Sequence, residues 1–487
     1  MTTRLQEADP TRQKRWAPKV RTGCQTCRVR RIKCDETHPR CKKCIARGLS
    51  CAYTLRHRPV LSASQQSRPL APKLAPSSSP SSSSSSSPLV AQAEPPNWHF
   101  MEAIRYYCAF VRPIRVAEHG THDIQDPPFH TGDAMAARFV CQIIGYQAVT
   151  VSRRRGRLVS FWEEPQFAAM RQNYSRYLIE FLGMVNRCIR GSGGSGGGTS
   201  RAFHYLWNLL SFDLTLNESL WQAHVKGALA YAQLVGGPRA ALSLPGPTIF
   251  FRQLVLQAIV SNATSPTTHQ ITGHLGYTDD DIKTILADED STRPFPVELV
   301  VVLRHITQVR VHAASRTRRI SELRQRMQHL FQQINTFDPN AWADELEFYR
   351  GAVTPAIGRL FQLATRLYGL LSLPASTAAP PPSLLAVTSP GLASLRVSQR
   401  TELLACLRDT WPALPDTTNM SWPLLVAGVV AADGPAEDRE FVARCLDRTW
   451  RNPLGDVAPL LVLEKLRAFW KSGKRGWEDC FDEPTPR

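Results

Sequence analysis

The sequence contains no long apolar run. A membrane-spanning helix needs roughly 18 consecutive apolar residues, and the longest candidate, around residues 424–432, is too short. No apolar segment follows the initial methionine in the way that a secretory signal peptide requires. Both absences predict an intracellular protein with no membrane partner. They also argue against disulfide bonds as the role of its 12 cysteines.

The motifs of common enzyme classes are also missing. There is no H-E-x-x-H, no Walker phosphate loop and no dinucleotide glycine fingerprint after a strand. Residues 193–197 formally match the hydrolase pattern G-x-S-x-G, but that motif needs a strand before it and a helix after it, and these residues lie inside a glycine run. His204 and His224 stand alone on helical patterns. We therefore predict that the protein is not an enzyme.

Acidic residues are scarce near the N-terminus, which concentrates positive charge there. Residues 1–60 contain 16 lysines and arginines against four acidic residues, so they carry +12 of the chain's formal net charge of +18. Residues 1–20 have neither helical nor strand periodicity and are interpreted as a disordered basic arm. A local excess of positive charge favours a polyanionic partner such as nucleic acid.

Six of the 12 cysteines form a repeated pattern. They read C-x2-C-x6-C twice, each cysteine lying 17 residues from its counterpart: Cys24, Cys27, Cys34, Cys41, Cys44 and Cys51. Zinc prefers four tetrahedral ligands, and thiolates suit it well. Two zinc ions need eight ligand positions, so two of the six sulfurs must each bind both ions. The repeat nominates the first cysteine of each half, Cys24 and Cys41. One zinc held by four cysteines is the alternative.

The two halves of this repeat differ in charge. Residues 28–33 contain four basic side chains, whereas residues 45–50 contain one. A basic helix held in place by metal suits the DNA major groove, where lysine and arginine contact phosphates and guanine. A solvated charged face on a structural zinc module is the alternative interpretation. The predicted DNA contacts are Arg28, Arg30, Arg31 and Lys33.

Residues 22–53, TGCQTCRVRRIKCDETHPRCKKCIARGLSCAY, resemble the fungal zinc binuclear cluster domain of transcription regulators. All six cysteines have that family's spacing, the basic residues lie between the second and third cysteines, and Pro39 falls in the loop between the halves. The resemblance implies two zinc ions, a nuclear location and recognition of CGG-like triplets in double-stranded DNA. Arg30 and Arg31 match the family's adjacent pair of basic residues.

The long region at residues 98–475 has helical periodicity. Apolar residues recur at i, i+3 and i+4, and glycines at 236, 237 and 473 indicate helix ends. We expect an all-helical domain with flexible loops near 191–200 and 374–392. More loosely, it resembles the helical regulatory domain of the same regulators, most clearly at residues 221–237. The apolar positions are Met101, Ile104, Cys108, Val111, Phe203, Leu206, Trp207, Leu210, Trp221, Val225, Ala228 and Leu229.

The segments on either side of this region are of low complexity or mixed polarity. Residues 56–97 are rich in serine and proline and are predicted to be a disordered linker. No coiled-coil heptads follow the cysteines. The 3, 4, 3, 4 spacing from Ile320 to Ile334 spans barely two heptads, which favours core packing. Residues 476–487 alternate acidic and aromatic residues and are predicted to be a tail, either an activation segment or plainly solvated.

The predicted fold class is therefore all-α, with a small zinc-cluster DNA-binding module at residues 21–55, a disordered linker and a large α-helical regulatory domain. The predicted function is sequence-specific DNA binding that regulates transcription by RNA polymerase II, together with the transcription machinery or co-regulators. A zinc-stabilised module for protein interaction or non-specific nucleic-acid binding is the alternative. The sequence leaves open the choice between monomer and homodimer. It also leaves open whether the helical domain binds a small-molecule effector, for which no residue pattern gives support.

Overall fold

The computed structural model describes two compact units, divided between Val90 and Ala91. The predicted arm, the predicted linker and most of the two predicted loops lie outside the described residues. The described residues are 27, 32–35, 41–47, 98–119, 133–190, 199–217, 220–244, 248–287, 295–345, 354–372, 389–414, 420–451 and 457–485.

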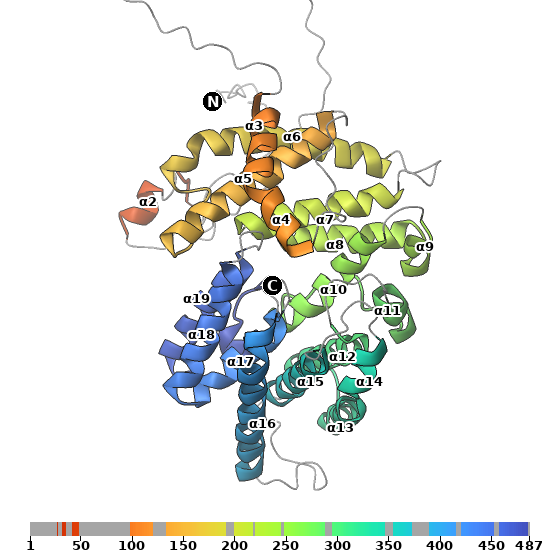
Figure 1. The fold of residues 1–487 in the computed structure, drawn as a ribbon. Helices are drawn as coiled ribbons and strands as arrows, with labels where there is room; N and C mark the ends of the chain where they lie inside the picture. The colour runs from red at the N-terminus through yellow and green to blue at the C-terminus, as the bar shows by residue number, and fades with distance from the viewer. Residues whose placement is uncertain are drawn as a thin grey trace, which may run out of the picture. The chain divides into compact units, whose positions relative to one another are not determined.

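Every regular element among the described residues is helical, which confirms the all-α prediction (Figure 1). The first unit contributes the short helix α2 (Lys42–Ile45). The second unit contains α3 (Trp98–Tyr106), the π-helical turn η1 (Tyr107–Val111), α4 (Arg112–His119), α5 (Asp133–Arg155), η2 (Pro165–Phe167), α6 (Ala168–Arg190), α7 (Thr199–Leu216), α8 (Trp221–Leu234), α9 (Pro238–Leu242), α10 (Ile249–Ala263), α11 (Asp279–Leu286), α12 (Val297–Ser315), α13 (Ile320–Thr336), α14 (Pro339–Glu345), α15 (Thr354–Leu371), α16 (Ser389–Thr410), η5 (Trp411–Ala413), α17 (Ser421–Val430), η6 (Ala431–Asp433), α18 (Ala436–Trp450), α19 (Ala458–Ser472) and α20 (Trp477–Cys480).

Most of the predicted apolar faces are buried, but the first prediction was right for only two of its four residues, Ile104 and Val111. The stripes on α7 and α8 lie in the core, as do four of the five apolar residues on α13. On α3 and η1, however, Met101 and Cys108 are exposed, and the buried residues are Ala103, Tyr107 and Val111. A π-helical turn has more residues per turn than an α-helix. That turn starts only at Tyr107, and Ala103 and Tyr107 are already four apart, so packing against α5 rather than the turn sets the buried face.

The predicted helix ends at glycines were confirmed. Helix α8 ends at Leu234, and Gly236 and Gly237 follow with φ of 108° and 95°. Helix α19 ends at Ser472, where Gly473 takes a left-handed conformation with φ of 70°. Glycine adopts positive φ without the steric cost that a Cβ imposes, so both chain reversals have a local cause.

The second unit has two hydrophobic cores that share helices α10 and α12. The first core collects buried residues from α3 to the start of α12, and the second collects them from the end of α10 to residue 481. On α10, Ile259 belongs to the first core and Val260 to the second; on α12, Val300 and Leu303 divide in the same way. In Figure 1, helices α3 to α9 lie above and helices α12 to α19 below, with α10 between the two groups.

Two buried arginines on α12 hold the loop that joins α10 to α11. Arg304 and Arg310 are 5% and 3% exposed. A buried guanidinium is tolerated only when its charge is paired and its donors are satisfied. Arg304 pairs with Asp279, and Arg310 pairs with Glu478. Arg304 also donates to the carbonyls of His274, Leu275 and Tyr277, and Arg310 donates to those of Asn262, Ala263 and Ser265.

The prediction that the helical domain ends at residue 475 and gives way to a disordered or solvated tail was wrong. Trp477 and Phe481 are each 1% exposed and belong to the second core. The Trp477 Nε1 donates to the carbonyl of Ala263 at 2.7 Å, and Thr485 exchanges backbone and side-chain hydrogen bonds with Thr264. Residues 477 and 481 are four apart and therefore lie on the same helix face. The alternation of acidic and aromatic residues in the sequence does not reveal this buried face.

Trp477 gives a direct test of this C-terminal packing. Trp477→Ala removes a fully buried ring and should lower the free energy of unfolding by about 3–5 kcal/mol. Trp98, which is 38% exposed, is the matched control. Trp98→Ala should cost less than about 1 kcal/mol, because Trp98 belongs to neither hydrophobic core and more than a third of its surface is exposed. Guanidinium unfolding of the full chain measures both values, and equal effects would contradict the packing.

The loop also contains His274, which is 1% exposed. Burial, and then the charge of Arg304, lowers the pKa of His274 to about 3, whereas an unfolded histidine has a pKa of about 6.5. Between these values only the unfolded chain binds the proton, so stability falls as the pH falls below about 6.5. From pH 7.5 to pH 5 the native chain should lose about 2 kcal/mol more than the His274→Phe variant. Denaturant unfolding at both pH values measures this, and equal losses would contradict it.

Candidate metal centre and nucleic-acid interface

The second half of the cysteine repeat is organised by helix α2, which starts directly after Cys41. Cys41 is extended, with φ of −69° and ψ of 146°, and its Sγ accepts a hydrogen bond from the Cys44 amide at 3.4 Å. The Cys41 carbonyl accepts from Cys44 and Ile45, both at 3.0 Å. Residues three apart at a helix start lie on one side. The C-x2-C spacing therefore brings both thiols to the same face.

The thiols of three cysteines lie at distances that suit a tetrahedral metal. The Sγ atoms of Cys27 and Cys41 are 3.6 Å apart, and those of Cys27 and Cys44 are 4.0 Å apart. A tetrahedron with Zn–S bonds of about 2.3 Å has sulfur–sulfur edges of roughly 3.8 Å. A disulfide bond is about 2.05 Å long. The spacing therefore fits thiolates around one zinc ion and does not fit a disulfide.

Cys41 belongs to two groups of ligand atoms. The Sγ atoms of Cys27, Cys41 and Cys44 all lie within 4.8 Å of one another. A second group within the same limit contains the sulfurs of Cys34 and Cys41 and a carboxylate oxygen of Asp35. Cys41 is the residue common to both, which is the position that a sulfur bound to two metal ions would occupy.

The buried residues in the described part of the first unit are cysteines rather than large apolar side chains. Cys27, Cys41 and Cys44 are fully buried and form its buried cluster, with Cys34 packed against them. The neighbouring Ile32 and Ile45 are 36% and 55% exposed. Apolar burial among these described residues is therefore small, and metal binding would supply folding free energy to this unit.

Asp35 is a site residue that the sequence analysis missed. Its Oδ1 accepts a hydrogen bond from the amide of Lys42 at 3.2 Å, which satisfies a donor in the first turn of α2. Aspartate is a favoured helix cap. The sequence signal was weak, because a cap normally directly precedes its helix and Asp35 lies seven residues before Lys42.

The structure places only some of the predicted site residues. Cys27, Cys34, Cys41 and Cys44 come together as predicted. Lys33, the predicted DNA contact that is described, is exposed next to Cys34. Lys42, Lys43 and Arg47 are also exposed and add positive charge to this unit. The residues that lie outside the described part of the chain are Cys24, Cys51, Arg28, Arg30 and Arg31.

The competing candidate sites have structural explanations where they are described. His224 pairs with Asp213 at 3.0 Å. The His204 ring stacks on Phe250 with centroids 4.2 Å apart, and burial followed by the charge of Arg138 lowers the pKa of His204 to about 4. Residues 193–197 lie outside the described residues. Among those described, the two cysteine groups are the ones able to hold a metal ion, and no helix is long and apolar enough to cross a membrane.

Two family patterns match the chain. Residues 22–59 match the fungal Zn(2)-Cys(6) binuclear cluster domain, which spans the six cysteines. Residues 197–484, more than half of the chain, match the fungal specific transcription factor domain. The second match ends at residue 484, so it includes the C-terminal segment that packs into the second core.

Curated relatives from fungi match different lengths of the chain. The phomenoic acid biosynthesis cluster-specific transcriptional regulator of Leptosphaeria maculans is 27% identical over 270 residues, covering 55% of this chain and 50% of the relative. A Zn(2)-C6 fungal-type transcription factor of Aspergillus fumigatus is 44% identical over 72 residues, covering 12% of this chain and 18% of the relative. The aspercryptin biosynthesis cluster-specific transcription regulator of Emericella nidulans is 54% identical over 35 residues, covering 7% of this chain and 6% of the relative.

These matches cover very different lengths of the chain. The chain aligns with half the length of the first of these relatives, and with far less of the other two. No solved structure matches it. The short, highly similar matches and the family pattern at residues 22–59 agree on the cysteine region, while the pattern at residues 197–484 covers most of the helical unit. The chain therefore belongs to the fungal Zn(2)-Cys(6) transcription factors, with a zinc-binding cluster domain followed by a fungal specific transcription factor domain.

Proposed function

We propose that this protein is a nuclear, sequence-specific DNA-binding regulator of transcription by RNA polymerase II. The observation that carries the proposal is the buried thiol cluster of Cys27, Cys41 and Cys44, bordered by exposed cations. A bound metal ion accounts for the buried thiols, and a polyanionic partner such as DNA accounts for the exposed basic side chains. Residues 197–484 match the fungal specific transcription factor domain, which supports regulation as the output rather than catalysis.

The cluster holds two zinc ions in this proposal. The repeat relates Cys24 to Cys41, so the sulfurs of these two residues bridge the ions while Cys27, Cys34, Cys44 and Cys51 each bind one. Cys41 is shared by the two described groups of ligand atoms, which supports its bridging role. Six thiolates against two divalent ions leave a charge of about −2, which nearby lysines and arginines offset.

DNA recognition uses the basic residues between the second and third cysteines. Arg30 and Arg31 contact the base edges of a CGG-like triplet, because arginine donates two hydrogen bonds to guanine in the major groove. Arg28 and Lys33 contact phosphates and set the position of the module on DNA. The exposure of Lys33 supports this assignment. The helical unit would then contact co-regulators or the transcription machinery, and dimerisation, where it occurs, would fall to this unit.

Zinc content tests the bridging assignment. Cys41→Ala removes a ligand from both ions and should abolish binding of both, whereas Cys44→Ala removes one ligand from one ion and should leave closer to one zinc per chain. Cys108→Ala is the matched control, because Cys108 is exposed and lies outside the cluster. Elemental analysis of the purified full chain measures the ratio. Equal zinc content in the Cys41 and Cys44 variants would contradict the assignment.

Arg30→Ala and Arg31→Ala test whether these two residues recognise the DNA base sequence. Each should weaken binding to a CGG-containing duplex by about 5- to 150-fold, which corresponds to about 1–3 kcal/mol for a lost base contact. Zinc content and binding to random DNA should change little. Lys226→Ala, an exposed basic residue on α8, is the control and should bind as the native chain does. Equal losses on CGG and random DNA would assign both arginines to phosphates and contradict sequence reading by this pair.

A further inference from the structure

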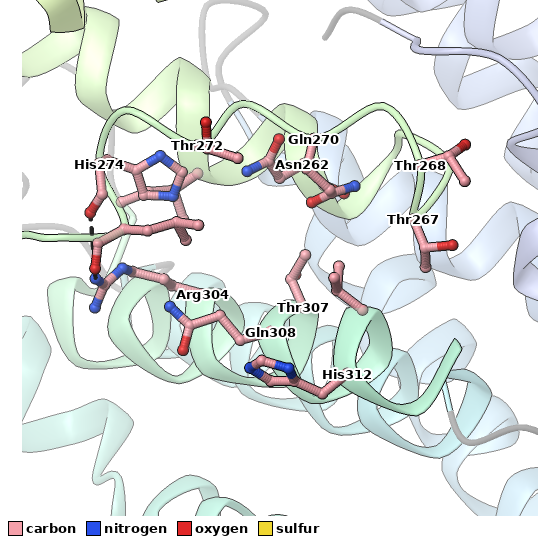
Figure 2. A pocket seen from close by; sticks show the side chains of 13 residues that line it. Asn262, Thr267, Thr268, Gln270, Thr272, His274, Arg304, Thr307, Gln308 and His312 are labelled. Atoms are coloured by element: carbon pink, nitrogen blue, oxygen red, sulfur yellow. Dashed lines mark hydrogen bonds between the residues drawn. The ribbon is translucent and has the colours of Figure 1, made fainter. Parts of the chain in front are cut away.

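A cavity of about 250 Å³ lies in the second unit, between α12 and the loop that joins α10 to α11. Figure 2 shows Gln270, Thr272 and His274 on the loop side and Thr307, Gln308 and His312 on the helix side, with open space between the two walls. The volume far exceeds the roughly 15 Å³ that one water needs, and a cavity of roughly 150 Å³ is known to accept benzene. A small organic molecule therefore fits.

The walls of this cavity are fixed by hydrogen bonds from buried side chains. The Asn262 side chain donates to the carbonyl of Ile271 at 2.9 Å and accepts from its amide at 2.7 Å. Arg304 and Arg310 anchor the two ends of the loop to α12. Gly273 lets the loop approach α8, because a Cβ there would lie 2.8 Å from the Cβ of Leu229. Small-molecule sites are usually formed in advance in this way.

Two buried polar atoms of the lining residues, His274 Nδ1 and Arg304 Nε, have no hydrogen bond within the described part of the chain. His274 is 99% buried. Leaving a buried polar atom unpaired costs free energy that a ligand or a water can recover. Burial and Arg304 keep this ring neutral at physiological pH, since they lower the pKa of His274 to about 3. A neutral imidazole can either donate to a hydroxyl or accept from one.

The residues that line the cavity favour a neutral ligand. None of the described lining residues is acidic, so a cation would find no counter-charge. The one lining arginine, Arg304, already pairs with Asp279 and bonds three carbonyls through its terminal nitrogens, so its charge is balanced. Its Nε has no hydrogen bond within the described residues and can donate to a hydroxyl oxygen. Ile259, Leu275 and Val311 supply apolar surface, while threonines and glutamines supply neutral polar groups.

The geometry points to this cavity as a binding site for a neutral, partly apolar small molecule that carries a hydroxyl group, with His274 as its hydrogen-bond partner. The site goes beyond the proposed DNA binding and does not depend on it. A ligand there would contact residues of both α10 and α12, the two helices that join the cores.

Three probes that share one ring test the site: 2-phenylethanol, phenylacetate and 2-phenylethylammonium, which are neutral, negative and positive. Saturation-transfer NMR on the full zinc-loaded chain, without DNA, measures their binding. We expect 2-phenylethanol to bind with a Kd on the order of 1 mM and each ion to bind at least about tenfold more weakly. Preference for either ion, or no binding by any probe, would overturn the proposal; the latter would make the cavity a water site.

Variants locate the binding. Thr272 is exposed on the rim, and the Leu275 amide donates to its backbone carbonyl, a bond that a new side chain leaves in place, so Thr272→Trp should block the cavity and abolish binding without unfolding the chain. His269→Trp is the matched control, since His269 is exposed on the same loop but outside the lining, and it should bind normally. His274→Phe should weaken binding about fivefold, the effect of one lost hydrogen bond. Unchanged affinity in Thr272→Trp would place the probe elsewhere and overturn the proposal.

Discussion

Sulfur–metal coordination is the interaction on which the N-terminal unit depends. Its described buried residues are cysteines, and its isoleucines are substantially exposed, so few apolar contacts are available to fold it. Zinc–thiolate bonds can supply that free energy. They would also leave the surface free for lysine and arginine, because the centre of the module needs no large hydrophobic side chains. The basic surface therefore depends on the metal centre, and loss of metal should remove the fold and, with it, the proposed DNA contacts.

The helical unit is built on a different principle. Two hydrophobic cores meet at α10 and α12, and the loop between α10 and α11 is held by arginines buried on α12. Trp477 and Thr485 bond the carbonyls of Ala263 and Thr264 at the end of α10. The C-terminal segment is thus bonded to the end of α10, where the loop that lines the cavity begins. A change in the loop would reach the C-terminal segment through Arg310, which bonds the loop and pairs with Glu478.

The features that could be predicted from the sequence are those that depend on the spacing of nearby residues. The C-x2-C turn at Cys41, the glycine helix ends and the amphipathic faces of α7 and α8 all depend on residues a few positions apart. Prediction failed where the determining partner is distant. Packing against α5 set the buried face of α3. The acidic and aromatic C-terminus proved to be core because Trp477 meets Ala263 more than 200 residues away, and Asp35 caps a helix that starts seven residues later. The cavity depends on Arg304 and Arg310 holding a loop, which no local pattern displays.

The most direct test of the central claim is selection of bound sites from a random-sequence DNA pool by the full zinc-loaded chain at near-physiological salt, with a chelator-treated sample as control. The proposed function predicts enrichment of CGG-like triplets that disappears on chelation. Two triplets at a fixed spacing would identify a dimer, and a single triplet would identify a monomer. A chain that retains its zinc and binds the pool without enriching any sequence would contradict sequence-specific recognition.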